Sequence, residues 1–166
     1  MKAQVRIALD QNFPVPILKC VEPFLEDINF THIAAIDPRL SEIDDWQLIV
    51  ALSHRGFHAL ASSDYNMLNQ HRVACAAHRT GTSLILIESL GHDPIRATGA
   101  LLLDLSFVAH RISPRRSTIF RIKRNNPTPE KASDYIAQRA KQMGISRKEL
   151  LAKEQLLPAD LIDPLT

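Results

Sequence analysis

The sequence predicts an α/β domain with a mostly parallel central sheet of about five strands, followed by a C-terminal helical extension. Short apolar runs alternate with helix-like segments from the N-terminus to about residue 124, which is the pattern of strand–helix–strand units. The run from Thr82 to Glu88 is almost continuously apolar, as in a strand buried on both faces of a parallel sheet. We therefore expect residues 1–124 to form the domain and residues 125–166 to form a helical tail.

The first half of the predicted domain contains three strands and two helices. Apolar residues recur at helical spacing in the first helix, and two acids begin the second, where they favour the helix dipole. Gly56 ends that second helix. We expect strands over residues 5–9, 30–36 and 57–62, and helices over residues 14–28 and 44–55.

The second half continues the alternation and then becomes more polar. Gly81 closes one helix, and Pro114 ends a long apolar one. The segment Asn125 to Pro129 has the composition of a linker and separates the domain from its charged tail. We expect strands over residues 82–88 and 117–123, and helices over residues 66–79, 95–112, 130–143 and 146–156.

Composition places the chain among ordinary globular proteins. Its 166 residues, 45% of them apolar, suffice for one domain with a proper core, and the net charge is only +2. No signal region begins the chain, and the longest apolar stretch, residues 99–109, is too short to span a membrane. Cys20 and Cys75 lie in apolar helical patterns, so we expect buried free thiols in a reducing compartment. These observations predict a cytoplasmic protein with no membrane partner.

Four acids are placed where ligand sites of parallel sheets form. Asp10 and Asp64 each follow an apolar strand, and Asp44 and Asp45 open a helix. Strand carboxyl ends and the helix starts that follow them share one edge of such a sheet, so we expect these carboxylates in one cleft. Clustered carboxylates favour a hard cation such as Mg²⁺ or Mn²⁺, although each acid could instead cap a helix or face solvent.

A basic segment follows the long apolar helix. Six cations fall within fourteen residues that contain no Asp or Glu: Arg111, Arg115, Arg116, Arg121, Lys123 and Arg124. Such a cluster suits the binding of nucleic-acid phosphates. The alternative is a solvated strand edge, where basic side chains prevent aggregation.

Three short motifs resemble those of PIN-like domains, in particular the VapC-type toxins and related PIN-like ribonucleases. They are Leu9-Asp10-Gln11-Asn12, Asp44-Asp45-Trp46 and Ser62-Ser63-Asp64-Tyr65-Asn66. The resemblance covers roughly residues 4–124 and implies a three-layer fold and an endoribonuclease that depends on Mg²⁺ or Mn²⁺. It also implies an RNA substrate, a role as the toxin of a toxin–antitoxin pair, and hence an antitoxin partner; a homodimer is a further possibility.

Carried over by position, the resemblance assigns metal binding to Asp10, Asp44 or Asp45, and Asp64. It implies catalytic roles for Asp10, Asp45 and Asp64, and supporting roles for Asn12 and Asn66. The expected nucleic-acid-binding residues are Arg115, Arg116, Arg121, Lys123 and Arg124.

Two residues depart from the family pattern. Gln11 and Asn66 stand where the family has acids, so two negative charges are missing. The fourth acid would then come from elsewhere, with Glu88 and Asp93 as candidates. An inactive relative is therefore an open alternative.

Two other classes of function fit parts of the sequence. A receiver domain is also a parallel α/β fold, and Asp10, Asp64 and Lys123 follow its order of acid, phosphoacceptor and lysine, although Gln11 breaks its usual acid pair. A catalytically inactive binding module would use the basic segment and the C-terminal helices to hold a partner.

Overall fold

The computed structural model describes residues 4–11, 13, 16, 23, 25, 27–90, 92–114, 116–123 and 131–154. The chain divides into two compact units, Met1–Asn125 and Asn126–Thr166. The first unit contains a five-stranded sheet in which all neighbouring strands are parallel, in the order β2-β1-β3-β4-β5. The strands are β1 (Val5–Leu9), β2 (Ile28–His32), β3 (Ala59–Ser62), β4 (Ser83–Glu88) and β5 (Ile119–Lys123). The predicted fold class, a three-layer α/β domain with a parallel sheet, is confirmed.

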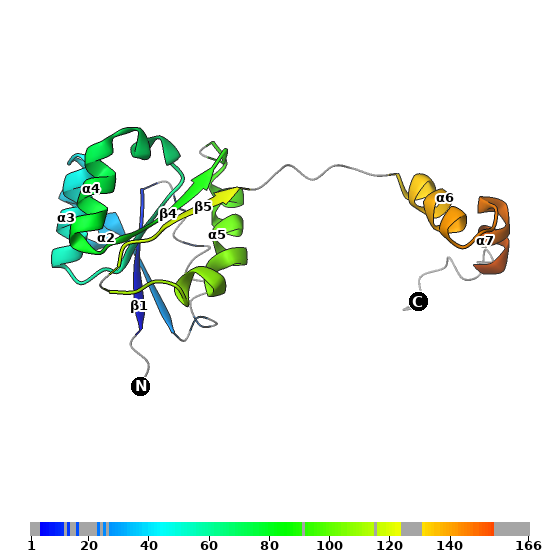
Figure 1. Cartoon of the computed structure of the whole chain (residues 1–166), viewed down its shortest axis with the longest axis horizontal. Helices are drawn as coiled ribbons and strands as arrows, with labels where there is room; N and C mark the ends of the chain where they lie inside the picture. The colour runs from blue at the N-terminus through cyan, green and yellow to red at the C-terminus, as the bar shows by residue number, and fades with distance from the viewer. Residues whose placement is uncertain are drawn as a thin grey trace. The chain divides into compact units, whose positions relative to one another are not determined.

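Helices cover both faces of the sheet (Figure 1). The helices of the first unit are α2 (Ile33–Ile36), η2 (Pro38–Ser41), α3 (Asp45–His54), η3 (Tyr65–Asn69), α4 (His71–Thr80) and α5 (Pro94–Ala109). The second unit contains α6 (Ala132–Gln142) and α7 (Arg147–Glu154), as the sequence predicts. No helix among the described residues is long and apolar enough to cross a membrane.

Alternate residues of each strand enter two separate cores. Leu60, Leu84 and Leu86 face α3 and α4, and we call this the α3/α4 side. Ile85 and Ile87 face α5 on the opposite side. β4 is buried along its whole length, which explains its nearly continuous apolar sequence.

The helix between β4 and β5 lies on an unexpected face. The connections through α3, α4 and α5 all lead in the same direction across the sheet. However, α3 and α4 cover one face, whereas α5 covers the other (Figure 1). The β4–α5–β5 connection therefore has the opposite hand to the two before it, which is uncommon for parallel strands. As a result, the α3/α4 side of β5 carries no buried side chain, and Ile119, Arg121 and Lys123 are exposed there.

Several predicted boundaries were wrong for local reasons. The strand predicted over 30–36 ends at His32, because the His32 side chain accepts a hydrogen bond from the Ala34 backbone N–H and caps α2. The helix predicted over 66–79 is broken at Gln70, whose backbone is extended, into η3 and α4. The helix predicted over 14–28 lies almost entirely outside the described residues.

The cysteine prediction was also wrong in part. Cys75 is a free thiol, as expected, but it lies on the exposed face of α4 rather than in the core. The buried face of α4 is formed by Val73, Ala76 and Ala77. Cys20 lies outside the described residues.

Candidate active site at the carboxyl edge of the sheet

Asp10 directly follows β1, and three hydrogen bonds position its backbone N–H and its carboxylate. Its backbone N–H donates to the Ala61 carbonyl at 3.0 Å, which extends the pairing of β1 with β3 by one residue. Its carboxylate accepts from the Gln11 N–H at 2.7 Å and from the Ser62 hydroxyl at 2.6 Å. The Asp10 carboxylate is therefore oriented before any ligand arrives.

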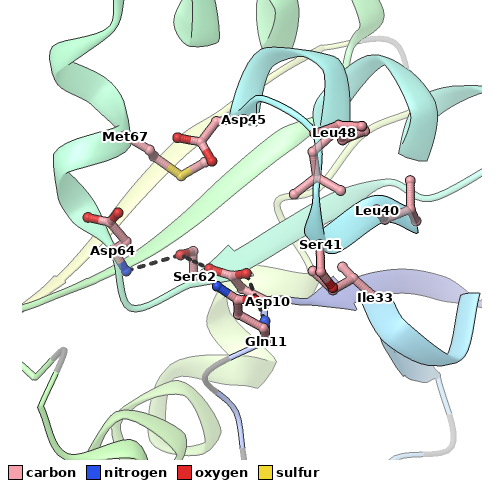
Figure 2. Close-up of a pocket in the computed structure, with 11 residues that line it drawn as sticks. Asp10, Gln11, Ile33, Leu40, Ser41, Asp45, Leu48, Ser62, Asp64 and Met67 are labelled. Atoms are coloured by element: carbon pink, nitrogen blue, oxygen red, sulfur yellow. Dashed lines mark hydrogen bonds between the residues drawn. The ribbon is translucent and has the colours of Figure 1, made fainter. Parts of the chain in front are cut away.

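Ser62 connects the ends of β1 and β3. It is fully buried, and its Oγ donates to Asp10 while accepting from the Asp64 backbone N–H at 3.0 Å. Asp64 in turn accepts from the Asn66 N–H at 3.0 Å and so caps η3. One serine hydroxyl thus sets the spacing between two of the predicted catalytic acids (Figure 2).

Asp45 approaches the same place from the start of α3. Its predecessor Asp44 is the N-cap of that helix, and the Asp44 N–H donates to the Gln47 side chain at 3.1 Å. Asp44 is exposed, whereas Asp45 is half-buried and faces Asp10 and Asp64 across a pocket. Of the two acids between which the sequence could not choose, Asp45 is therefore the one that lines the pocket.

The electrostatic surroundings of Asp45 reflect this convergence. Burial raises the pKa of the Asp45 carboxyl, and the negative charges of Asp10, Asp64 and Asp44 raise it further. No described residue donates a hydrogen bond to this carboxylate. The ionised form of Asp45 is consequently disfavoured in this pocket.

The pocket holds about 100 Å³ of space for solvent, enough for several water molecules. Its polar surface is supplied by Asp10, Gln11, Ser41, Asp45, Ser62 and Asp64, as Figure 2 shows. Its apolar wall includes Ile33, Leu40, Leu48 and Met67. The pocket lies outside the carboxyl ends of β1 and β3. The strand that follows β1 in the sequence, β2, lies on one side of β1, and the next strand, β3, lies on the other, so the direction of strand addition reverses here. Open parallel sheets bind ligands at such switch points.

The donor set of the pocket suits a hard divalent cation. Carboxylate, amide and hydroxyl oxygens are the ligands that Mg²⁺ and Mn²⁺ prefer, and Mg²⁺ usually keeps several of its waters. Among the described residues, no three His, Cys, Asp or Glu side chains are gathered closely enough to enclose an ion by themselves. An ion bound in this pocket would therefore have to keep several waters among its ligands.

The other predicted members of the acidic site lie in different places. Gln11 lines the pocket, whereas Asn66 does not, and its side chain accepts from Asn69 at 3.5 Å. Asp93 caps α5 through the Arg96 N–H at 3.0 Å, so it is not the fourth acid of the pocket. Asn12 lies outside the described residues.

The basic segment is partly neutralised by an acid from the neighbouring strand. Glu88 ends β4 and bonds to Arg121 Nε and, at 3.0 Å, to Lys123 Nζ. Glu88 therefore does not line the acidic pocket either. Arg111 stacks on Phe107 at 3.6 Å from the ring centre, and Arg116 is exposed. Arg115 and Arg124 lie outside the described residues.

Sequence reasoning missed the role of two residues. Ser62 belongs to the Ser-Ser-Asp motif, but only the pairing of β1 with β3 brings its hydroxyl to Asp10. Glu88 is far from the basic segment in the sequence, and only the pairing of β4 with β5 brings them together. The position of Ser62, two residues before an acid at the end of a strand, was the available signal.

Comparison of the chain with protein-family models, curated proteins and solved structures finds no match.

Proposed function

We propose that the protein is a Mg²⁺- or Mn²⁺-dependent endoribonuclease of the PIN-like type. The observation that carries the proposal is the convergence of Asp10, Asp45 and Asp64, from three separate segments, on one pocket at the switch point of the sheet. Burial and the neighbouring carboxylates raise the pKa of Asp45, so the ionised site is costly without a cation, and a site of this kind is more typical of function than of stability.

The residues of the pocket suit phosphodiester hydrolysis. A bound cation would supply a polarised phosphate and an acidic water. Asp10, oriented by Ser62, and Asp64, held at the start of η3, would bind that ion. Asp45 has a raised pKa and no described hydrogen-bond donor, so it would accept the proton of the attacking water. Attack of this water on the phosphorus would break the P–O bond to the leaving nucleotide, whose oxygen would take a proton from bulk water, so the products would be two RNA fragments.

A cleavage assay with single-stranded RNA and Mn²⁺ tests this proposal. Asp10→Asn, Asp45→Asn and Asp64→Asn should each lower the cleavage rate by about 100-fold or more. Asp44→Asn is the matched control: Asp44 adjoins Asp45 but is exposed and outside the pocket, and Asn remains a good N-cap. Wild-type cleavage rates in any pocket variant would overturn the proposed site, and an inactive wild type with Mn²⁺ would favour the binding module.

The strand order favours a second candidate, the receiver domain, because the order 2-1-3-4-5 is that of receiver-type sheets. Two observations weigh against it. Right-handed connections would place the helix before β5 on the α3/α4 side, whereas α5 covers the other face. Lys123, the candidate receiver lysine, is bound to Glu88. Acetyl-phosphate labelling of Asp64 would support the receiver, and its absence together with RNA cleavage would exclude it.

The toxin role, the antitoxin partner, the homodimer and the cytoplasmic location are further parts of the proposal. They follow from the PIN-like resemblance of the sequence motifs. Growth arrest on expression of the wild-type chain, absent for Asp64→Asn, is the expected sign of a toxin. Rescue by a co-expressed neighbouring gene product would identify the antitoxin.

A further inference from the structure

Glu88, Arg121 and Lys123 form a cluster of one acid and two bases beside the acidic pocket. Leu86 of β4 is paired with Ser62 of β3 on one side and with Arg121 of β5 on the other, so these three residues form one row across the sheet. Neighbouring strands are about 4.8 Å apart, which places the Arg121 backbone about 10 Å from that of Ser62. This spacing corresponds to a few nucleotides of one RNA strand.

The cluster lies on the same side of the sheet as the pocket. Ala8 and Leu60 face the α3/α4 side, so Asp10 and Ser62, two residues further along each strand, face that side as well. Leu84 and Leu86 face it too, and their partners on β5 are Ile119 and Arg121. Because α5 covers the other face, this side of β5 is open to solvent.

The three members of the cluster differ sharply in exposure. The Glu88 side chain is only 8% exposed, whereas those of Arg121 and Lys123 are 56% and 68% exposed. Burial would raise the pKa of Glu88, but the hydrogen bonds from Lys123 and Arg121 outweigh burial and lower it. Glu88 is therefore ionised at neutral pH, and one fixed negative charge faces two positive charges.

The bond to Glu88 uses only one corner of the guanidinium. Arg121 donates through Nε. Its two Nη groups donate to no acceptor among the described residues. An arginine held in this way presents a planar pair of donors, which matches two oxygens of a phosphate. Because the side chain is already ordered, less conformational entropy is lost when a phosphate binds.

We propose that Glu88 is a positioning residue that holds Arg121 and Lys123 as a phosphate-binding subsite for the RNA strand entering the acidic pocket. This inference rests on the proposed nuclease function for its ligand. A buried carboxylate that merely needed a counter-charge would be satisfied by one cation, whereas here a positive charge remains in excess on an open surface.

Binding of a short fluorescein-labelled single-stranded RNA of mixed sequence, measured in EDTA with the full-length protein, tests the inference. Glu88→Gln raises the net positive charge by one, so simple attraction predicts tighter binding. A positioning role predicts binding about tenfold weaker, because the arginine is no longer held. Arg121→Lys keeps the charge but loses the planar fork, and it should weaken binding similarly without lowering the melting temperature.

Asp37→Asn is the matched control. Asp37 also binds two arginines, Arg39 at 2.6 Å and Arg55 at 3.4 Å, but it lies outside both the pocket and β5. Its RNA affinity should equal that of the wild type. In a cleavage assay with Mn²⁺, Glu88→Gln should raise KM and leave kcat nearly unchanged, which a general loss of structure would not do.

The outcomes separate this inference from the proposed function. The inference is overturned if Glu88→Gln binds the RNA as tightly as the wild type or more tightly. It is also overturned if Arg121→Lys binds the RNA with wild-type affinity, even if the protein cleaves RNA. A wild type that fails to bind the RNA in EDTA overturns it as well. Glu88-dependent binding without Mn²⁺-dependent cleavage would support the subsite and refute the nuclease. If Glu88→Gln fails to fold, Arg121→Lys decides.

Discussion

The hydroxyl of Ser62 connects two of the acidic residues that line the pocket. It donates to Asp10 and accepts from the Asp64 N–H, and it is fully buried. Ser62→Ala should lower the unfolding free energy by about 1–2 kcal/mol, because two hydrogen bonds are lost in a buried place. It should also slow RNA cleavage by about 10–100-fold, since residues that orient metal-binding groups have effects of this size.

Denaturant unfolding and cleavage kinetics measure the two effects of Ser62→Ala. Ser41→Ala is a suitable control, because Ser41 lines the same pocket and, within the described residues, makes no hydrogen bond to an acid. A Ser62→Ala variant with full activity would show that Asp10 needs no support from β3.

Asp45 gives the apo protein a defined pH dependence. Its pKa is raised above the ordinary value of 3.8, so the folded state holds this proton more tightly than the unfolded state does. Stability contributed by the protonated form is present at low pH and is lost as the pH rises through the folded pKa. Asp45→Asn should therefore stabilise the apo protein at pH 7, by about 0.5 kcal/mol after allowance for solvent screening.

Thermal melts of Asp45→Asn and the wild type at several pH values check this expectation. The difference should disappear below pH 3.8, where the wild-type carboxyl is also neutral. Saturating Mn²⁺ should reverse the order, because the wild type binds the ion more tightly. Equal melting temperatures at all pH values would mean that the three acids do not interact.

Gln11 and Asn66, the two departures from the family pattern, now have different expected effects. Gln11 lines the pocket and Asn66 does not. Gln11→Glu should lower the apo melting temperature through repulsion and tighten Mn²⁺ binding, measured by calorimetry. Asn66→Asp serves as its control and should change both quantities less. Larger effects of Asn66→Asp than of Gln11→Glu would mean that η3, rather than Gln11, occupies the position of the fourth acid.

At the scale of secondary-structure elements, the Arg6 side chain of β1 contacts the backbone at the end of α3, next to Gly56. Gly56 has a φ of +74°, and an added Cβ would lie 3.1 Å from Arg6 Nη1. That guanidinium donates to the Arg55 carbonyl at 2.9 Å, so it is not free to move away. The left-handed backbone and the close approach together require glycine here.

Gly56→Ala should lower the unfolding free energy by about 1–2 kcal/mol, as measured by chemical denaturation. Gly99→Ala is its matched control with the opposite sign. Gly99 lies within α5, and an added Cβ would meet nothing within 4 Å, so alanine should stabilise the helix by about 0.5–1 kcal/mol. Destabilisation by both variants would mean that the α5 surface is covered in solution.

At the scale of the whole molecule, both cores of the sheet domain are complete before the linker. Every buried residue of the α3/α4-side core and of the α5-side core lies within Met1–Asn125. A chain that ends after residue 125 should therefore unfold cooperatively, within a few degrees of the melting temperature of the full chain. Calorimetry checks this, and loss of cooperative unfolding would show that the helical unit is required for folding.

The alternation of apolar runs with helical segments was sufficient to predict the fold class from the sequence. Hydrophobic periodicity is a local property, and a run such as Leu84 to Ile87 indicates burial on both faces without knowledge of its neighbours. The same locality placed Asp10 and Asp64 at strand ends and Asp45 at a helix start. Once a parallel sheet is inferred, those positions share one edge.

Tertiary structure alone decided the rest, because it depends on which strands are neighbours and on which face each helix packs. The Ser62 bridge requires β1 beside β3, and the pairing of Glu88 with Arg121 requires β4 beside β5. The choice of Asp45 over Asp44 depends on where α3 begins: Asp44 is its N-cap with an extended backbone, and Asp45 is its first helical residue. The open face of β5 follows from the placement of α5 on the opposite side of the sheet. The strand pairings and the placement of α5 are long-range relations that residue types and spacing do not show.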